Sequence, residues 1–220
     1  MGVCRNGCSA RRDREVLEVL VPERSIRQRI GELGRRISAD YAAARSIHLV
    51  GVLRGAFLFL ADLCRTLTVP ATVDFLAVET YRQGDRAGAK PRLFSDLRDD
   101  IAGRHVLLVE DIVDTGGTLH FLYELLARRG PASLRCCTLL DKPSRRRMEV
   151  RVEYAGFEIP DVWAVGYGLD DRERYRTLRH IGFRDPGRTG LFRAVVPHGR
   201  DRRETVPDLF QVRPQTRRGR

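Results

Sequence analysis

Ten consecutive residues, VEDIVDTGGT at 109–118, place three acidic side chains and two glycines between an apolar run and an amphipathic one. Gly116 and Gly117 have no side chains to cover their backbone N–H groups, and a helix that begins near Thr118 would point its positive dipole end at the same place. Thr115 and Thr118 add hydroxyl groups. The stretch therefore predicts a phosphate-binding turn, although it has neither the lysine of a P-loop nor the glycine spacing of a dinucleotide site.

The acids Glu110, Asp111 and Asp114 would repel a bare phosphate. They suit a ligand that also carries vicinal hydroxyl groups or a Mg²⁺ ion, because carboxylates bind both. A sugar phosphate meets both demands. Acids are also common near the start of a helix, where the dipole favours them, but that explanation leaves the Thr-Gly-Gly-Thr run unexplained. We therefore predict a sugar-phosphate site.

Apolar residues recur in patterns that predict alternating strands and helices. Strands are expected over 46–52, 71–81, 105–111 and 133–142, helices over 56–67 and 118–130, and short extended pieces over 154–170. A first helix is expected over 22–45, where apolar residues repeat at helical spacing: Ile26, Ile30, Leu33, Ile37 and Tyr41. This alternation predicts an open α/β fold with helices on both faces of a mostly parallel sheet. Such sheets bind ligands at the carboxyl ends of their strands, which is where 109–118 falls.

Residues 82–96 are charged, rich in glycine and without periodicity, so they predict a long mobile loop.

The net charge of +11 belongs mostly to the two ends of the chain. Residues 184–220 contain ten arginines against four acidic residues, and residues 1–14 contain four arginines against one aspartate. Such ends can bind nucleic acid or another polyanion. The alternative is a general preference for arginine, since Lys90 and Lys142 are the only lysines of the chain. We favour this alternative.

Composition bounds the class of protein. With 42% hydrophobic and 31% charged residues the chain fits a soluble globular domain, and no apolar stretch approaches the length of a membrane span. The N-terminal sequence lacks the apolar core of a secretory signal, so a cytoplasmic location is expected. Neither the five cysteines nor the five histidines show the spacing of a structural zinc site, which predicts reduced thiols.

Several blocks of the chain together resemble a known family. The stretch VLLVEDIVDTGGTL resembles the phosphoribosyl-pyrophosphate (PRPP) signature of the type I phosphoribosyltransferases. The blocks GVLRGAFLFLADL, TVDFLAVETY, TLLDKP and GFEIPDVWAVGYGLDDRERYRTL resemble the purine branch, the hypoxanthine-guanine phosphoribosyltransferases, in the same order. Four ordered blocks are more specific than one motif. The resemblance covers residues 15–183 and implies the family's α/β fold, an open sheet flanked by helices with a small hood.

The resemblance also implies an activity. Members of this family transfer ribose 5-phosphate from PRPP to N9 of a 6-oxopurine, with Mg²⁺, and release pyrophosphate. It implies that Glu110 and Asp111 bind the ribose hydroxyls and that Asp114 is the general base or hydrogen-bond partner at purine N7. It further implies that the 5′-phosphate is bound by the turn residues Thr115, Gly116, Gly117 and Thr118.

The remaining site residues are implied in the same way. Pyrophosphate is expected at Arg54, Gly55 and Arg176, where the family commonly has lysine in place of Arg54 and a non-proline cis peptide. The purine is expected to receive a hydrogen bond at O6 from Lys142 and to stack on Trp163. The 2-amino group of guanine is expected at the backbone carbonyls of Ala164 and Asp170, and Mg²⁺ is expected near Glu110, Asp111 and Asp170.

The resemblance further implies a lid that begins at Thr80 and Tyr81, where the family usually has Ser-Tyr, and a homo-oligomer, a dimer or a tetramer. We expect a basic extension at 1–14, the phosphoribosyltransferase domain at 15–183 and a disordered basic tail at 184–220.

Two alternatives remain open at this point. One is an RNA-binding regulator built on the same fold, which the basic ends favour. The other is a weakly active paralogue, because Arg54, Thr80 and Trp163 differ from the commonest residues of the family.

Overall fold

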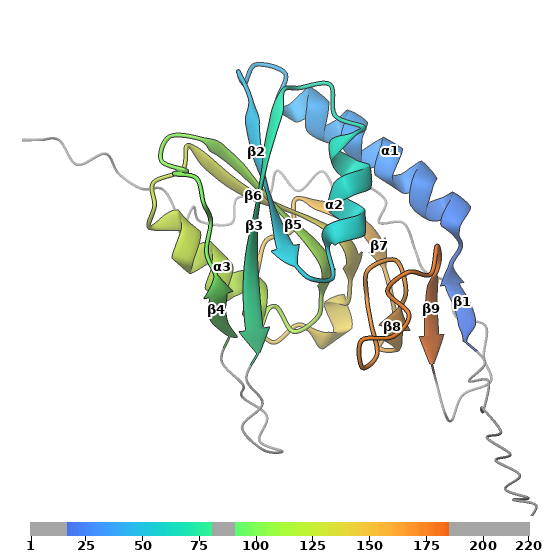
Figure 1. Cartoon of the computed structure of the whole chain (residues 1–220). Helices are drawn as coiled ribbons and strands as arrows, with labels where there is room; N and C mark the ends of the chain where they lie inside the picture. The colour runs from blue at the N-terminus through green and yellow to red at the C-terminus, as the bar shows by residue number, and fades with distance from the viewer. Residues whose placement is uncertain (1–16, 81–90, 185–220) are drawn as a thin grey trace, which may run out of the picture.

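The computed structural model describes residues 17–80 and 91–184. Its main sheet has six strands in the order β4-β3-β2-β5-β6-β7, and the neighbours from β3 to β7 are parallel (Figure 1). The strands are β2 (Ile47–Leu53), β3 (Ala71–Thr80), β4 (Pro91–Ser95), β5 (His105–Val113), β6 (Ser133–Asp141) and β7 (Tyr154–Glu158). The predicted α/β fold is confirmed.

The order of the strands fixes where a ligand can bind. The chain runs outward from β2 to β3, and β5 then pairs with β2 on its other side. The boundary between β2 and β5 is therefore a topological switch point, beyond which the two following connections diverge and leave a crevice. Arg54 follows β2, and Glu110 and Asp111 lie near the end of β5, so the sequence places its polar residues at this crevice.

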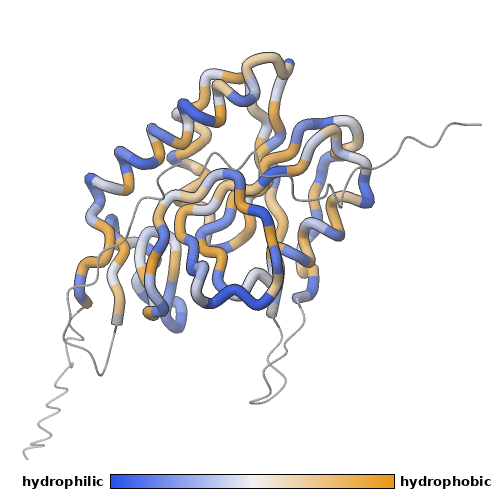
Figure 2. Tube along the Cα trace, turned by 180° about the vertical axis from the view of Figure 1, so that it is seen from behind, coloured by the Kyte–Doolittle hydropathy of each residue, from blue (hydrophilic) through white to orange (hydrophobic). Residues whose placement is uncertain are grey.

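Helices cover both faces of the sheet. The helices α1 (Glu23–Asp40) and α2 (Phe57–Cys64) lie on one face, and α3 (Gly117–Ala127) lies on the other (Figure 1). Along β5 the side chains alternate between these two layers: Leu107 and Val109 pack with α1 and α2, and Val106 and Leu108 pack with α3. Figure 2 shows the apolar residues concentrated on the central strands, while α1 alternates between polar and apolar positions. Strands buried on both faces explain the continuous apolar runs of the sequence.

A small second sheet forms the hood. It consists of β1 (Glu18–Val21), β9 (Ile181–Arg184) and β8 (Trp163–Val165), in that order and antiparallel. The strands β1 and β9 were not predicted, because each has only four residues and too few alternations to give a periodic signal.

One prediction was wrong. Residues 91–95, which we expected to belong to the long loop, form the edge strand β4, antiparallel to β3. Pro91 and the charges around it hid the strand, but a proline is tolerated at the first residue of an edge strand. Leu93 packs against the core under α3. The rest of the predicted loop, 82–90, lies outside the described residues, as does almost all of the two basic ends.

The other elements begin and end within a few residues of their predicted bounds, and Pro22 is the N-cap residue of α1. A 3₁₀ turn, η1 (Pro143–Arg145), follows β6. In the part of the chain that the structure describes, no helix is long and apolar enough to cross a membrane. The cytoplasmic location stays a prediction.

Candidate active site

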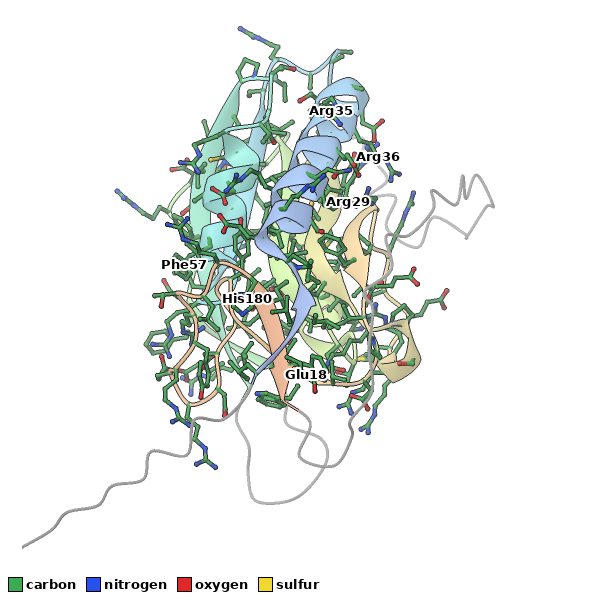
Figure 3. The ribbon with its side chains drawn as sticks, turned by 90° about the vertical axis from the view of Figure 1, so that its right-hand side faces the viewer. Glu18, Arg29, Arg35, Arg36, Phe57 and His180 are labelled. Atoms are coloured by element: carbon green, nitrogen blue, oxygen red, sulfur yellow. The ribbon has the colours of Figure 1, made fainter. Side chains whose placement is uncertain are left out.

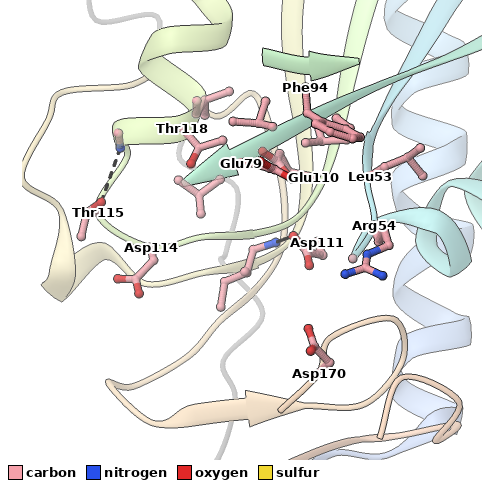
Figure 4. Close-up of a pocket in the computed structure, with 18 of the residues that line it drawn as sticks. Leu53, Arg54, Glu79, Phe94, Glu110, Asp111, Asp114, Thr115, Thr118 and Asp170 are labelled. Atoms are coloured by element: carbon pink, nitrogen blue, oxygen red, sulfur yellow. Dashed lines mark hydrogen bonds between the residues drawn. The ribbon is translucent and has the colours of Figure 1, made fainter. Parts of the chain in front are cut away.

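A cavity of about 860 Å³ opens at the carboxyl ends of β2 and β5. Eleven of the residues predicted from the sequence line it: Arg54, Gly55, Glu110, Asp111, Asp114, Thr115, Gly116, Gly117, Thr118, Asp170 and Arg176. They come from the β2–α2 connection, the end of β5, the turn before α3 and the hood. In Figure 4, Asp111 lies between the turn that carries Asp114 and the loop of Arg54, with Asp170 on the hood side. The structure thus brings together the residues predicted for the sugar, the phosphate and the pyrophosphate.

The carboxyl groups of Glu110 and Asp111 lie near the end of β5, where Glu110 is buried and Asp111 is half-buried. Glu110 is 5% exposed, and burial together with the neighbouring charge of Asp111 raises its pKa well above the usual value. Burial also raises the pKa of Asp111 to about 6, although hydrogen bonds from backbone N–H groups and the charge of Arg176 oppose the shift. Desolvation disfavours the charged form of an acid. A ligand that supplies hydroxyl donors or a cation would therefore stabilise the charged form of these carboxyl groups.

The turn before α3 has the geometry of an anion cradle. Gly116 is the N-cap of α3 with φ of 87°, in the left-handed region that glycine adopts most easily. A Cβ at Gly116 would also lie 2.9 Å from the carbonyl oxygen of Met148. The N–H of Gly117 points toward the hydroxyl of Thr115 at 3.5 Å (Figure 4). This contact is long, and the N-cap residue supplies no side-chain cap, so N–H groups of the first turn of α3 can bind an external anion.

The β2–α2 connection approaches β5 closely. The peptide bond between Leu53 and Arg54 is cis, as the resemblance implied. A Cβ at Gly55 would collide with the carboxylate of Asp111, and a Cβ at Gly168 would collide with the carbonyl of Gly55. Only residues without side chains allow this three-layer contact between β5, the loop and the hood.

Two arginines on the hood side of the cavity share one acidic partner, Glu173. A guanidinium nitrogen of Arg54 lies 2.6 Å from one carboxylate oxygen of Glu173, and Arg176 lies 3.4 Å from the other oxygen. Arg176 also pairs with Asp170 at 2.9 Å and donates to the carbonyl of Gly168. The carboxylate of Glu173 thus bridges the two cations that were predicted to hold pyrophosphate.

Asp114 lies among cations. Arg145 donates from Nε to its Oδ1 at 2.8 Å, and Nζ of Lys142 lies 4.0 Å from its Oδ2. Lys142 is 5% exposed, and burial lowers its pKa. Lys142 therefore presents one buried ammonium group beside the candidate general base.

The predicted purine-binding residues are less closely gathered. Trp163 on β8 is 53% exposed, and Ala164 beside it is buried. Lys142, Trp163 and Ala164 do not line the cavity, although Lys142 reaches Asp114, which does. Thr80 ends β3, and Tyr81 lies outside the described residues. The lid prediction is therefore untested.

Several residues that lie at the site were not predicted from the sequence. Glu79, Phe94 and Ser95, from β3 and β4, line the cavity, and Phe94 is 72% exposed. Glu173 and Arg145 were not singled out either. The pairing of β4 with β3 brings Phe94 to the cavity, and no local sequence pattern predicts this pairing.

Carboxylates at the cavity are suited to a hard cation, which prefers oxygen ligands. Among the described residues, the group of potential metal ligands whose donor atoms lie within 4.8 Å of one another is elsewhere, at His48, Asp74 and Asp99. His48 and Asp74 lie in the first halves of β2 and β3, away from the cavity, and Asp74 accepts backbone N–H groups of Arg98 and Asp99. That carboxylate already fastens the loop before β5.

Comparison with known proteins agrees with this site. Residues 20–172 match the phosphoribosyl transferase domain family. The chain belongs to this family. It is 49% identical to the hypoxanthine phosphoribosyltransferase of Salmonella typhimurium over 170 residues, which cover 77% of this chain and 96% of that protein. It is 44% identical to the hypoxanthine-guanine phosphoribosyltransferase of Mycobacterium tuberculosis over 177 residues, which cover 78% and 88%.

Solved structures of the family are similar as well. The hypoxanthine-guanine phosphoribosyltransferase of Bacillus anthracis has a TM-score of 0.71 at 39% identity, over 76% of this chain and 98% of that one. A mutant of the Trypanosoma cruzi hypoxanthine phosphoribosyltransferase, solved as a ternary substrates complex, has a TM-score of 0.72 at 42% identity, over 77% and 95%.

Proposed function

We propose that this phosphoribosyltransferase is a purine salvage enzyme that transfers the 5-phosphoribosyl group of PRPP to N9 of hypoxanthine, guanine or both. The products are IMP or GMP and pyrophosphate. The observation that carries the proposal is that one cavity contains both an acid-lined, glycine-rich turn and, opposite it, the arginine pair of Arg54 and Arg176. A sugar with a phosphate at one end and pyrophosphate at the other matches this distribution of charge.

The residues divide the work by their chemistry. The turn at 115–118 holds the 5′-phosphate through backbone N–H groups and hydroxyls, and Glu110 and Asp111 accept hydrogen bonds from the ribose hydroxyls. The bond from C1 to the pyrophosphate oxygen breaks, and its electron pair leaves with pyrophosphate. The lone pair of N9 forms the new bond, and the proton on N7 passes to Asp114. Fixing the reactants in line and stabilising the leaving charge supply most of the rate.

Mg²⁺ fits this donor set when it arrives with PRPP. Magnesium keeps several waters and binds through one or two carboxylates together with substrate phosphates, rather than in a cage of protein ligands. Glu110, Asp111 and Asp170 are the residues that we propose beside it, and it would neutralise charge on the leaving pyrophosphate. Arg54 and Arg176 add fixed positive charge on the same side, once pyrophosphate displaces Glu173.

Lys142 is the proposed reader of the base. An ammonium group donates a hydrogen bond to the O6 of a 6-oxopurine, whereas the 6-amino group of adenine would oppose donor to donor. Trp163 is the proposed stacking surface, with its exposed ring available to a purine. The carbonyls of Ala164 and Asp170 are proposed to receive the 2-amino group of guanine. Kinetics with hypoxanthine, guanine and xanthine would rank the three bases.

The decisive experiment is magnesium-dependent formation of IMP from hypoxanthine and PRPP. We expect Asp114→Ala to lower kcat by about 100-fold or more, because it removes the proton acceptor. An unchanged melting temperature would show that the fold is intact. Full activity in the mutant would contradict the role of Asp114, and a wild-type protein that does not take up PRPP with Mg²⁺ in calorimetry would contradict the whole proposal.

The alternative of an RNA-binding regulator gains nothing from the relatives named above, all of which are named as enzymes. Filter binding at low ionic strength, with the full chain and with a chain that ends at residue 183, tests it directly, since phosphate contacts weaken with salt. We further propose that residues 15–183 make up the catalytic domain, with basic segments before and after it, and that Thr80 and Tyr81 begin a lid.

A homo-oligomer is also proposed. Three large apolar side chains are exposed on α2 and on the face of β3 beside it: Phe57 at 38%, Val73 at 44% and Phe75 at 40%. Figure 3 shows Phe57 at the surface, near the start of α2. We call these three residues the β3 patch. An exposed apolar patch of this kind marks an interaction surface, and a second copy of the chain is the occupant that we propose.

A further inference from the structure

Arg145 lies where three parts of the proposed site meet. Its Nε donates to Oδ1 of Asp114 at 2.8 Å, and one of its terminal nitrogens donates to Oδ2 of Asp161 at 3.1 Å. Asp114 belongs to the turn before α3, and Asp161 stands two residues before Trp163. One guanidinium group therefore connects the candidate general base to the segment that carries the candidate stacking ring.

The backbone around Arg145 is held firmly against the turn of Asp114. The N–H of Lys142 bonds to the carbonyl of Val113 at 3.0 Å, and the N–H groups of Arg147 and Met148 both bond to the carbonyl of Thr115, at 3.0 and 3.1 Å. These bonds flank η1 on both sides. These backbone hydrogen bonds thus fix the direction of the Arg145 side chain. A side chain must be fixed in this way to position another group accurately.

A second arginine, Arg146, binds the main chain of Asp114. Arg146 donates to the backbone carbonyl of Asp114 at 3.0 Å and pairs with Asp141. Arg146 therefore fixes the main chain of Asp114, and Arg145 fixes its carboxylate. The charged groups that face this carboxylate are Lys142 and Arg145, with Asp161 behind Arg145.

The geometry leaves the two carboxylate oxygens of Asp114 in different surroundings. Oδ1 accepts the short hydrogen bond from Arg145, whereas Oδ2 lies 4.0 Å from Lys142, beyond hydrogen-bond distance. The hydrogen bonds to Asp114 and Asp161 raise the pKa of Arg145 further, so its charge is permanent. Oδ2 is accordingly the oxygen that remains available to a purine.

We propose that Arg145 is a positioning residue of the phosphoribosyl transfer, which holds Asp114 through one oxygen so that the other faces purine N7, and which links this orientation to the purine-stacking segment through Asp161. The inference rests on the proposed function. Arg145 itself touches neither substrate. Its contribution is to keep Asp114 aligned for the proton of N7, and a misplacement on the order of 1 Å in such a group costs about 100-fold in rate.

The test compares neighbouring arginines. Arg145→Ala is expected to lower kcat about 10- to 100-fold while the KM for PRPP changes less than about twofold, because alignment of the base is lost and PRPP binding is not. Arg145→Lys should recover part of kcat, since an ammonium can still reach Asp114. Arg147→Ala, the matched control, removes an exposed arginine two residues away with the same change of charge and is expected to behave like the wild type.

A double-mutant cycle examines the link to the stacking segment. Asp161→Asn should lower kcat by itself, and it should lower kcat much less when Arg145 is already alanine, because the two residues act through one contact. If Arg145→Ala does not fold, Arg145→Lys and Asp161→Asn still carry the measurement.

Three outcomes would overturn the inference while the wild type remains active: a kcat for Arg145→Ala equal to that of Arg147→Ala, a loss that lysine does not relieve, or independent effects of Arg145 and Asp161. An inactive wild type would instead contradict the proposed function.

Discussion

The carboxyl group of Asp111 meets several constraints at once. It lies near the end of β5 beside the buried Glu110, the backbone of Gly55 lies against it, and the charge of Arg176 acts on it from the hood. Burial raises its pKa from 3.8 to about 6. The charged form of Asp111 is therefore destabilised in the folded protein at a place where a ligand can bind to it. A shifted pKa of this kind is typical of functional sites.

This shift predicts a dependence of stability on pH. Between pH 3.8 and about 6 the folded protein retains a proton on Asp111 that the unfolded chain has released, so the free energy of unfolding falls as the pH rises through this window. Asp111→Asn removes the penalty. Without magnesium, we expect the variant to be more stable than the wild type by about 1–3 kcal/mol at pH 7.5 and by much less at pH 4.5.

Urea unfolding at the two pH values measures this difference, with Glu149→Gln, an exposed acid, as the control. An equal gain at both pH values would show that the effect has another origin.

The charge of Glu173 predicts an effect on the binding of pyrophosphate. Its carboxylate bridges Arg54 and Arg176 where we propose that pyrophosphate binds, so it must be displaced when pyrophosphate arrives. We expect Glu173→Gln to tighten the binding of magnesium pyrophosphate by about two- to fivefold, a modest effect because the pair is exposed to solvent. Calorimetry measures it, and Glu149→Gln again serves as the control. Weaker binding in Glu173→Gln would mean that the glutamate orients the arginines rather than competing with the anion.

At the scale of elements, the contact between α1 and the end of α2 depends on a glycine. A Cβ at Gly34 would collide with the side chain of Thr66 and lie 3.2 Å from its carbonyl oxygen, whereas a Cβ at Gly31, one turn earlier, would meet only the flexible end of Arg35 at 3.7 Å. The same substitution in the same helix therefore has opposite expected effects.

Gly31→Ala should stabilise the protein by about 0.5–1 kcal/mol, the difference in helix propensity. Gly34→Ala should destabilise it by about 1–3 kcal/mol, the usual cost of overpacking. Thermal unfolding of both variants decides the matter, and a stabilised Gly34→Ala would show that α1 and α2 can separate without loss.

The elements also show what the sequence could predict. The central strands and the helices were predictable because their apolar periodicity extends over many residues, and the acid-and-glycine turn was predictable because its chemistry is local. The strands β1, β4 and β9 have four or five residues each and depend on partners far along the chain. The roles of Phe94, Arg145 and Glu173 depend on tertiary contacts in the same way. Gly55 and Gly168 are needed because three layers touch there, which no single segment reveals.

For the whole molecule, the β3 patch predicts self-association. Phe75→Glu places a charge at the centre of the patch and should shift the protein toward a smaller species in sedimentation velocity, because a buried unpaired charge disfavours an interface. Val19→Glu, on an exposed residue of the hood, is the control and should leave the sedimentation coefficient unchanged. A wild type that sediments as a monomer at high concentration would contradict the homo-oligomer.

The pairing of β1 with β9 has a consequence for the connectivity of the chain. Glu18 lies opposite Phe183 in the hood, so the first and last described strands are hydrogen-bonded neighbours. A short peptide could therefore join residue 184 to residue 17, and new termini could be opened at the exposed turn around Gly130, where a Cβ would meet nothing within 4 Å. Such a circular permutant would keep every layer of the fold while both basic segments are omitted, and it would separate the work of the folded domain from whatever its two arginine-rich ends contribute.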